Sequence, residues 1–299
     1  MATIKKKVTI VLKPGIFKNL EGTINELLTT LVDRHHCVVQ FLDRKDKRLT
    51  RIIKKHEKKI RFIEKEKIHD LSDMIITLGG DGTFLGTCRY ASKKSAPIFG
   101  VNMGHLGFLT QFIREDLTCY IEDALRGELH VQELPLNSIR VYRKEKCAYE
   151  GHFFNDAVLT KHDISRIFTL ELVADDDHVY DLSGDGLIIS SPVGSTAYSL
   201  AAGGPIVHPG LDCLILTPIC THSLNYRPLV IPHTFKLRVY PLGNEQDIAL
   251  TLDGQEMFSV LPSDVVEIDR KGQKKVKMYC KPERSFFKTL KEKLTHGQR

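Results

Sequence analysis

The chain has 299 residues, of which 42% are hydrophobic and 27% charged, and its formal net charge is +6. This length and composition indicate a globular protein of about two domains and exclude a disordered chain. No apolar stretch approaches the length that crosses a bilayer, the apolar run after the first lysines suits a strand better than a signal peptide, and the seven cysteines show no CxxC pattern. We therefore expect a cytoplasmic protein without membrane contact, disulfide framework or zinc site.

Strands and helices alternate in the first half of the chain. Each run of β-forming residues is followed by a segment with apolar residues at helical spacing, which predicts an α/β domain with a doubly wound parallel sheet. The predicted strands are 8–12, 37–42, 74–78 and 98–101, and the predicted helices are 21–34, 83–91 and 115–126.

A basic segment lies between residues 44 and 67. It holds twelve Lys or Arg against four acids, a charge of +8 that leaves −2 for the rest of the chain. Because Phe62 is its only aromatic residue and its isoleucines fall at helical spacing, we interpret it as a solvated surface helix rather than a specific nucleic-acid site.

From about residue 131 short β-rich runs separated by turn signals predict a β-rich domain. We expect an α/β domain at 1–130, a β-rich domain at 131–280 and a C-terminal helix within 281–299 that packs on the first domain, with a site between the two domains. The predicted strands are 138–142, 153–160, 168–173, 187–190, 213–217, 229–231, 235–239, 248–252, 265–268 and 276–279, and one short helix covers 196–202.

The third predicted strand ends in Gly79-Gly80-Asp81-Gly82-Thr83, directly before a helix. A tight turn with Asp as the helix N-cap would explain these residues. Their position also matters, because ligands of open α/β sheets bind at the carboxyl ends of the strands, and free N–H groups at a helix start attract phosphate. The segment is therefore a candidate phosphate site, although it is not a Walker A loop.

Three stretches of the β-rich domain carry further polar and small residues. Phe154-Asn155-Asp156 offers donors and acceptors that suit paired hydroxyls such as those of a ribose, although Asn-Asp in such a region is usually a turn. The stretch 183–210 runs from a buried strand into SSPVGSTAYSLAAGGP, where hydroxyl and small residues surround a helix start. Asp253-Gly254-Gln255 has the form of a hairpin turn.

Together these stretches resemble the NAD kinase family. GGDGT alone is shared with 6-phosphofructokinases and with lipid kinases. The long stretch at 185–206 distinguishes the NAD kinase family from these other kinases. The resemblance implies an α/β domain, a β-rich domain that binds the dinucleotide, and a site between them. The motifs in the family's order are GGDGTFL (79–85), NMGHLGFL (102–109), FND (154–156), DGLIISSPVGSTAYSLAAGGPI (185–206), HSLNYRPLVI (222–231) and DGQ (253–255).

The resemblance implies transfer of the γ-phosphate of ATP to the 2′-hydroxyl of the adenosine ribose of NAD, which gives NADP. It implies that Asp81 is the general base beside Gly82 and that Asn155 and Asp156 bind ribose hydroxyls. Asp156 stands where the family often has Glu. The other residues implied are Asp185 near the nicotinamide, Arg166 at a phosphate or polar edge of the ligand, Val193, Thr196, Ala197, Tyr198, Ser199, Leu200 and Ala201 around the adenine and ribose, and Gln255 closing the pocket.

The expected cofactor is a divalent metal, Mg²⁺ carried by ATP, without a dedicated protein cage. We expect NAD and ATP as substrates, no specific nucleic acid, and a homo-oligomer, either a dimer or a tetramer. The phosphate donor stays open among ATP, another nucleotide and polyphosphate. Two other functions stay open: a diacylglycerol- or sphingosine-type lipid kinase, which would expose an apolar surface, and a non-catalytic dinucleotide-binding regulator, which would not need Asp81.

Overall fold

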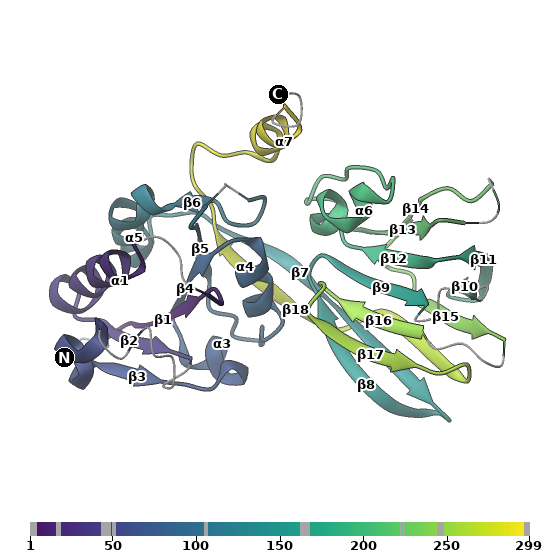
Figure 1. Cartoon of the computed structure of the whole chain (residues 1–299), viewed down its shortest axis with the longest axis horizontal. Coiled ribbons are helices and arrows are strands. Elements are labelled where there is room, and N and C mark those ends of the chain that lie inside the picture. Colours follow the sequence, from purple (N-terminus) through teal and green to yellow (C-terminus); the bar gives the residue numbers. More distant parts are fainter. Residues whose placement is uncertain are drawn as a thin grey trace. The chain divides into compact units, whose positions relative to one another are not determined.

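The computed structural model describes residues 5–15, 19–42, 49, 52–104, 107–161, 168–221, 223, 225–243 and 248–295. The chain divides into two compact units, Met1–Leu134 with Lys274–Arg299, and Pro135–Gln273 (Figure 1). It passes between them within two long strands, β7 (Val131–Arg143) and β18 (Asp264–Tyr279). No helix in the part of the chain that the structure describes is long and apolar enough to cross a membrane.

The first unit is built on a parallel sheet, as predicted. The last residues of β18 also run parallel to the central strand β5 through Met278 and Ile98. All six residues of β4 and all five of β5 are buried, as in central strands covered on both faces. The parallel strands lie in the order β3 (Ile60–Phe62), β2 (Val38–Phe41), β1 (Lys7–Leu12), β4 (Met74–Gly79), β5 (Ile98–Asn102) and β6 (Phe112–Ile113).

Helices α1 (Leu20–Leu28) and α5 (Leu117–Arg126) lie side by side and share one apolar core with the sheet (Figure 1). A π-helical segment, Thr29–Arg34, continues α1. Gly127 ends α5 with a φ of 79°, a conformation that glycine adopts without strain. The described part of this unit also contains the α-helices α3 (Ile68–Leu71), α4 (Asp81–Cys88) and α7 (Phe286–Thr295).

The prediction of one surface helix over residues 44–67 is wrong for the described part of that segment. Residues 53–59 form 3₁₀ turns, and Ile60–Phe62 is strand β3, which pairs in parallel with β2. Ile60 and Phe62 are partly buried against the core of the unit. The alternation Ile60-Arg61-Phe62 fits an edge strand with one buried face, and this outweighs the helical spacing of the isoleucines. Residues 43–48, 50 and 51 lie outside the described residues.

The second unit contains two antiparallel groups of strands that share one apolar core, which confirms the β-rich prediction. One group consists of β7, its hairpin partner β8 (Lys146–Phe153), β11 (Asp177–Gly184), β10 (Phe168–Ala174), β15 (Leu237–Leu242) and β18. The other follows the order β14 (Leu229–Pro232), β13 (Cys213–Ile219), β12 (Gly186–Ser190), β9 (Asp156–Lys161), β16 (Ile248–Leu252) and β17 (Glu256–Val260).

Two strands change sheets where the sequence shows no clear signal. The predicted strand 153–160 is interrupted, because β8 ends at Phe153 and β9 begins at Asp156 in the other sheet. The chain makes a similar change of sheet at Asp185, between β11 and β12. A Cβ on Gly186 would lie 2.4 Å from the Leu159 carbonyl oxygen, so glycine serves close strand approach there.

Candidate active site

The GGDGT segment joins β4 to α4 in the first unit. Gly79 ends β4, and a Cβ at this position would lie 2.2 Å from the Thr83 hydroxyl oxygen. Gly80 precedes the helix, and its carbonyl oxygen accepts the N–H groups of Thr83 and Phe84 at 3.0 and 3.2 Å. Asp81 is therefore the first residue of α4, at the carboxyl end of a central parallel strand, where ligands of α/β sheets bind.

The carboxylate of Asp81 is held by the loop 107–110. Its Oδ2 accepts the N–H of Phe108 at 2.8 Å. Its Oδ1 accepts the N–H groups of Leu109 and Thr110 at 3.2 and 2.9 Å and the Thr110 hydroxyl at 2.8 Å. A Cβ on Gly107 would lie 1.9 Å from Oδ1, so glycine is what leaves room for the carboxylate. Four donors fix this carboxylate in one orientation.

The Thr110 hydroxyl has a defined direction. Asn102, at the end of β5, donates its Nδ2–H to Thr110 Oγ1 at 2.9 Å, which leaves the hydroxyl proton for Asp81. Asn102 Oδ1 in turn accepts the N–H of Gly104 at 2.8 Å. The motif at 102–109 thus belongs to the support of Asp81, although its residues 105 and 106 lie outside the described part of the chain.

In the second unit, Asp253 organises the backbone of the candidate ribose-binding residues. Asp253 and Gly254 form the turn between β16 and β17, with φ of 50° and 63°. Asp253 Oδ1 accepts the N–H groups of Asn155 and Asp156 at 2.7 and 3.1 Å. Both carboxylate oxygens accept the N–H of Phe154, at 3.1 and 2.9 Å. Sequence reasoning treated Asp253 as a turn residue only and missed this contact.

Asn155 and Asp156 carry two signs of a ligand site. Asp156 is 5% exposed. Burial, and secondly the neighbouring Asp253 carboxylate, raise the pKa of Asp156 to about 7. Asn155 Oδ1 is buried and has no hydrogen-bond partner among the residues described. Since an unpaired buried acceptor is unfavourable, a donor supplied by a ligand would complete this group.

The stretch after β12 packs on the same strand break. The Ser191 hydroxyl donates to the Phe154 carbonyl oxygen at 2.6 Å and accepts the Gly194 N–H at 3.2 Å. A Cβ on Gly194 would lie 2.2 Å from the Asn155 carbonyl oxygen, which explains glycine there. A 3₁₀ turn, Val193–Thr196, and helix α6 (Tyr198–Ala201) follow. The structure therefore brings this stretch together with the candidate ribose-binding residues.

The other predicted ligand contacts differ in their surroundings. Ser199 is fully buried and its hydroxyl shares a 2.9 Å hydrogen bond with Thr217. Tyr198 is 47% exposed. Gln255 is exposed and follows the Asp253 turn. Asp185 precedes β12 and pairs with Lys161 at 2.7 Å. Asp185 is five residues before Ser190 and therefore lies roughly 16 Å away, beyond the opposite end of β12. Arg166 lies outside the described residues.

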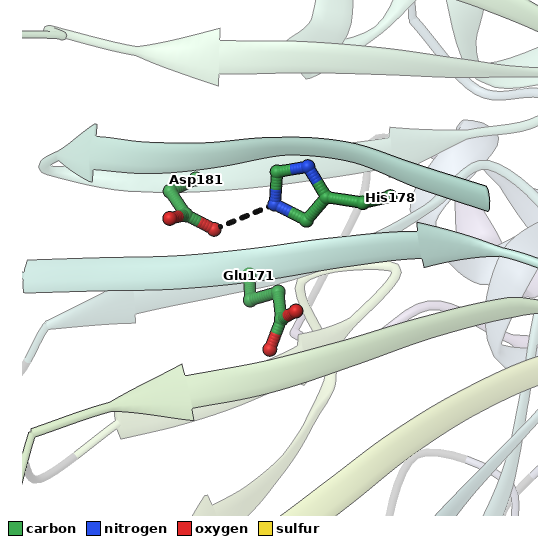
Figure 2. A group of neighbouring side chains, drawn as sticks. All are labelled: Glu171, His178 and Asp181. Carbon is green, nitrogen blue, oxygen red and sulfur yellow. Dashed lines mark hydrogen bonds and ion pairs between the residues drawn. The ribbon is translucent and has the colours of Figure 1, made fainter. Parts of the chain in front are cut away.

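Within the described ranges, one group of side chains has a spacing that a metal ion could use, Glu171, His178 and Asp181 on the β10–β11 hairpin (Figure 2). Their candidate ligand atoms lie within 4.8 Å of one another. Ligand atoms around a tetrahedral zinc ion are roughly 3.3 Å apart. His178 and Asp181 already contact each other at 2.9 Å and have side-chain exposures of 54% and 56%. We interpret this group as a surface hydrogen bond between His178 and Asp181 beside a second acid, Glu171.

Two family models match the chain, the ATP-NAD kinase N-terminal domain over residues 3–129 and the ATP-NAD kinase C-terminal domain over residues 154–280. The NAD kinase of Syntrophotalea carbinolica is 40% identical over 236 residues, which cover 79% of this chain and 82% of the relative. The NAD kinase of Trichlorobacter lovleyi is 35% identical over 280 residues, which cover 93% and 95%.

Two solved structures share the fold. Yeast NADH kinase complexed with NADH has a TM-score of 0.87 and 22% identity, over 97% of this chain and 88% of that one. An NAD kinase from Archaeoglobus fulgidus in complex with ATP has a TM-score of 0.73 and 22% identity, over 97% and 98%.

Proposed function

The chain belongs to the NAD kinase family and is an ATP-NAD kinase, and from this premise we propose that Asp81 is the general base of the reaction. The 2′-oxygen of the adenosine ribose of NAD forms a bond to the γ-phosphorus of ATP. The bond from that phosphorus to the β,γ-bridging oxygen breaks, and ADP leaves with the electron pair. The carboxylate of Asp81 takes the proton of the 2′-hydroxyl, and the product is NADP.

The orientation of Asp81 is the observation that carries this proposal. Oδ1 accepts three hydrogen bonds from the loop, whereas Oδ2 accepts only that of Phe108 among those identified. Each carboxylate oxygen has two lone pairs, so Oδ2 is the atom with remaining capacity for the substrate hydroxyl. Phosphoryl transfer depends chiefly on positioning and charge stabilisation, and a base held by four donors meets the first requirement.

Asn155 and Asp156 bind the ribose hydroxyls of NAD in this proposal. The unpaired Oδ1 of Asn155 accepts a hydrogen bond from one ribose hydroxyl. Asp156, ionised above its pKa of about 7, accepts a hydrogen bond from another. The adenine and ribose contacts come from Val193, the stretch 196–201 and Gln255, with Asp185 at the nicotinamide and Arg166 at a phosphate or polar edge.

The phosphate donor is ATP with Mg²⁺ in this proposal. Apart from its chain neighbours and the backbone of its own helix, Gly82 has no described atom within 4 Å of where a Cβ would stand, which leaves space beside Asp81 for phosphate. Mg²⁺ is usually bound through one or two carboxylates and the phosphates of its substrate, so the metal would be held mainly by phosphate oxygens. When bound, Mg²⁺ supplies positive charge that offsets the charge on the transferring group.

Incubation of the pure protein with ATP, Mg²⁺ and NAD tests the reaction, with the product identified by mass and by 2′- versus 3′-phosphate position. Asp81→Asn tests the base and should lower kcat by about 10²–10⁴-fold. The new amide places an N–H against that of Phe108, at a cost of about 1–3 kcal/mol in stability. NAD affinity should be retained.

Asp264→Asn is the matched control for that loss of stability. Asp264 is 1% exposed and accepts hydrogen bonds from Arg143 and the Leu261 N–H. This variant should be destabilised with kcat unchanged, whereas wild-type kcat in Asp81→Asn would refute the role of Asp81.

The two other functions considered from the sequence are set aside, because both domain models and the relatives above are NAD kinases. We also propose that the protein forms a homo-oligomer. Size-exclusion chromatography with light scattering tests this.

A further inference from the structure

The loop that holds Asp81 is itself held from its opposite side by Arg284. Arg284 Nη2 donates to the carbonyl oxygen of Gly107 at 3.4 Å. The N–H of Phe108, which belongs to the same peptide group, donates to Asp81 Oδ2 at 2.8 Å. One peptide group therefore connects a guanidinium to the carboxylate proposed as the base, with its C=O toward the cation and its N–H toward the anion.

Arg284 makes further contacts with the same loop and with α7. Its Nη1 donates to the carbonyl oxygens of Thr110 and Gln111 at 3.5 and 3.3 Å, and its Nη2 donates to Thr289 Oγ1 at 3.2 Å. The side chain is 11% exposed and lies 4.0 Å from the carboxylate of Glu292. These hydrogen bonds are long, but a charged donor in a buried environment makes each of them stronger than its neutral equivalent.

A buried guanidinium directed at backbone carbonyl oxygens calls for an explanation. Burial lowers the pKa of Arg284, while the carboxylates of Glu292, Asp81 and Asp116 act in the opposite direction. An arginine nevertheless stays protonated in proteins, so a full positive charge sits behind the loop. The field of this charge is offset in part by the Asp81 carboxylate on the far side of the peptide group.

We propose that Arg284 is a positioning residue for Asp81, which acts by polarising and fixing the Gly107–Phe108 peptide group whose N–H holds the carboxylate. This inference rests on the proposed role of Asp81. It gives the segment after β18 a part in the reaction, although this segment is far from the GGDGT motif in sequence.

A neighbouring anchor keeps the same segment in place without Arg284. Lys281 Nζ contacts both carboxylate oxygens of Asp116 at 2.8 Å. The Lys281 backbone N–H donates to Gln111 Oε1 at 2.9 Å. A change at Arg284 should therefore remove the guanidinium contacts with Gly107, Thr110 and Gln111 while the segment stays attached through Lys281.

The test compares Arg284→Gln, Asp81→Asn and the double variant in steady-state kinetics, NAD calorimetry and thermal melting. Arg284→Gln should lower kcat by about 10- to 100-fold, the usual cost of losing a residue that orients an active group. The KM for NAD should change little. In the Asp81→Asn background the same change should cost nothing further, because the carboxylate that Arg284 positions is gone.

Chemical rescue provides an independent readout. Added guanidinium should restore part of kcat in Arg284→Ala and should have no such effect on Arg140→Gln. Arg140 is the matched control, because it is a 17% exposed arginine paired with Asp269 at 3.1 Å in the other unit. Arg140→Gln should keep wild-type kcat. Rescue can be measured on whatever fraction of the Arg284 variant is folded, so a less stable variant is still informative.

The outcomes separate this inference from the proposed function. An inactive Asp81→Asn with wild-type kcat in Arg284→Gln would overturn the inference and leave the role of Asp81 intact. Multiplicative losses in the double variant, or no guanidinium rescue, would also overturn it. Wild-type kcat in Asp81→Asn would instead refute the proposed base, and the inference with it.

Discussion

Replacement of Asp253 by Asn should move the pH range in which NAD binds. In the wild type, burial and the Asp253 carboxylate raise the pKa of Asp156 to about 7. A ribose hydroxyl can donate a hydrogen bond to either oxygen of ionised Asp156. In the protonated form one of these oxygens carries the proton and is a poorer acceptor. NAD affinity should therefore rise with pH and level off above about 7, with a slope of up to tenfold per pH unit below the pKa when only the ionised form binds.

The direction of the shift follows from the two causes. Asp253→Asn removes the neighbouring negative charge, which raises the pKa of Asp156, but leaves burial, the larger cause, in place. The midpoint should therefore move to lower pH and stay above about 3.9, the value for an exposed aspartate. The new amide nitrogen, in the place of Oδ2, also faces the Phe154 N–H, at a cost of about 1–3 kcal/mol in folding free energy.

The same group gives stability a pH dependence of defined sign. The pKa of Asp156 is higher in the folded than in the unfolded chain, so its contribution is complete below about pH 4 and is lost as pH rises to about 7. The pKa difference corresponds to a change on the order of 4 kcal/mol over that range. Asp156→Asn should abolish this contribution, which urea unfolding measured from pH 4 to 8 can detect.

Calorimetry from pH 5.5 to 8.5 measures the midpoint of the pH dependence of NAD affinity. ATP is left out, because ATP itself titrates in this range. Wild type, Asp253→Asn and Asp156→Asn form the series, and Asp264→Asn is the control that removes a buried carboxylate elsewhere in the unit. The control should keep the wild-type midpoint, and Asp156→Asn should show no titration in this range. A wild-type affinity independent of pH, or a midpoint that Asp253→Asn leaves in place, would refute the reasoning.

Three further outcomes are expected. Gly107→Ala should lower kcat more than NAD affinity, because its Cβ would lie 1.9 Å from Asp81 Oδ1, and unchanged kinetics would contradict the loop geometry. Gly194→Ala should weaken NAD binding and lower the melting temperature, because its Cβ would lie 2.2 Å from a backbone oxygen of Asn155. DNA binding through the basic segment 44–67 should be weak and fall steeply with salt in a filter or anisotropy assay, and tight sequence-dependent binding would contradict this.

The parts of the fold that could be predicted are those with a local pattern. The apolar run that forms β4 and the glycines after it predicted a buried strand and a tight turn into a helix, because both depend on residues adjacent in sequence. Strands β8, β11 and β17 were missed. The exposed positions of β8 and β11 include Lys146, Glu150, Asp177 and Asp181, so these strands do not stand out from turns. β17 is only five residues long and follows directly on the Asp253 turn.

The roles of Asp253 and Arg284 could not be predicted, because both side chains bind backbone N–H or C=O groups, which every part of the sequence carries. Asp253 binds backbone N–H groups 97 to 99 residues away. Arg284 binds carbonyl oxygens 173 to 177 residues away. Every residue except proline carries such a donor, and every residue carries such an acceptor, so only the folded chain selects the ones that matter. Asp253-Gly254 also had a sufficient local explanation as a hairpin turn. The turn explains the backbone conformation of Asp253 but not the contacts of its carboxylate. A residue that fits a turn can therefore still have a second role through its side chain.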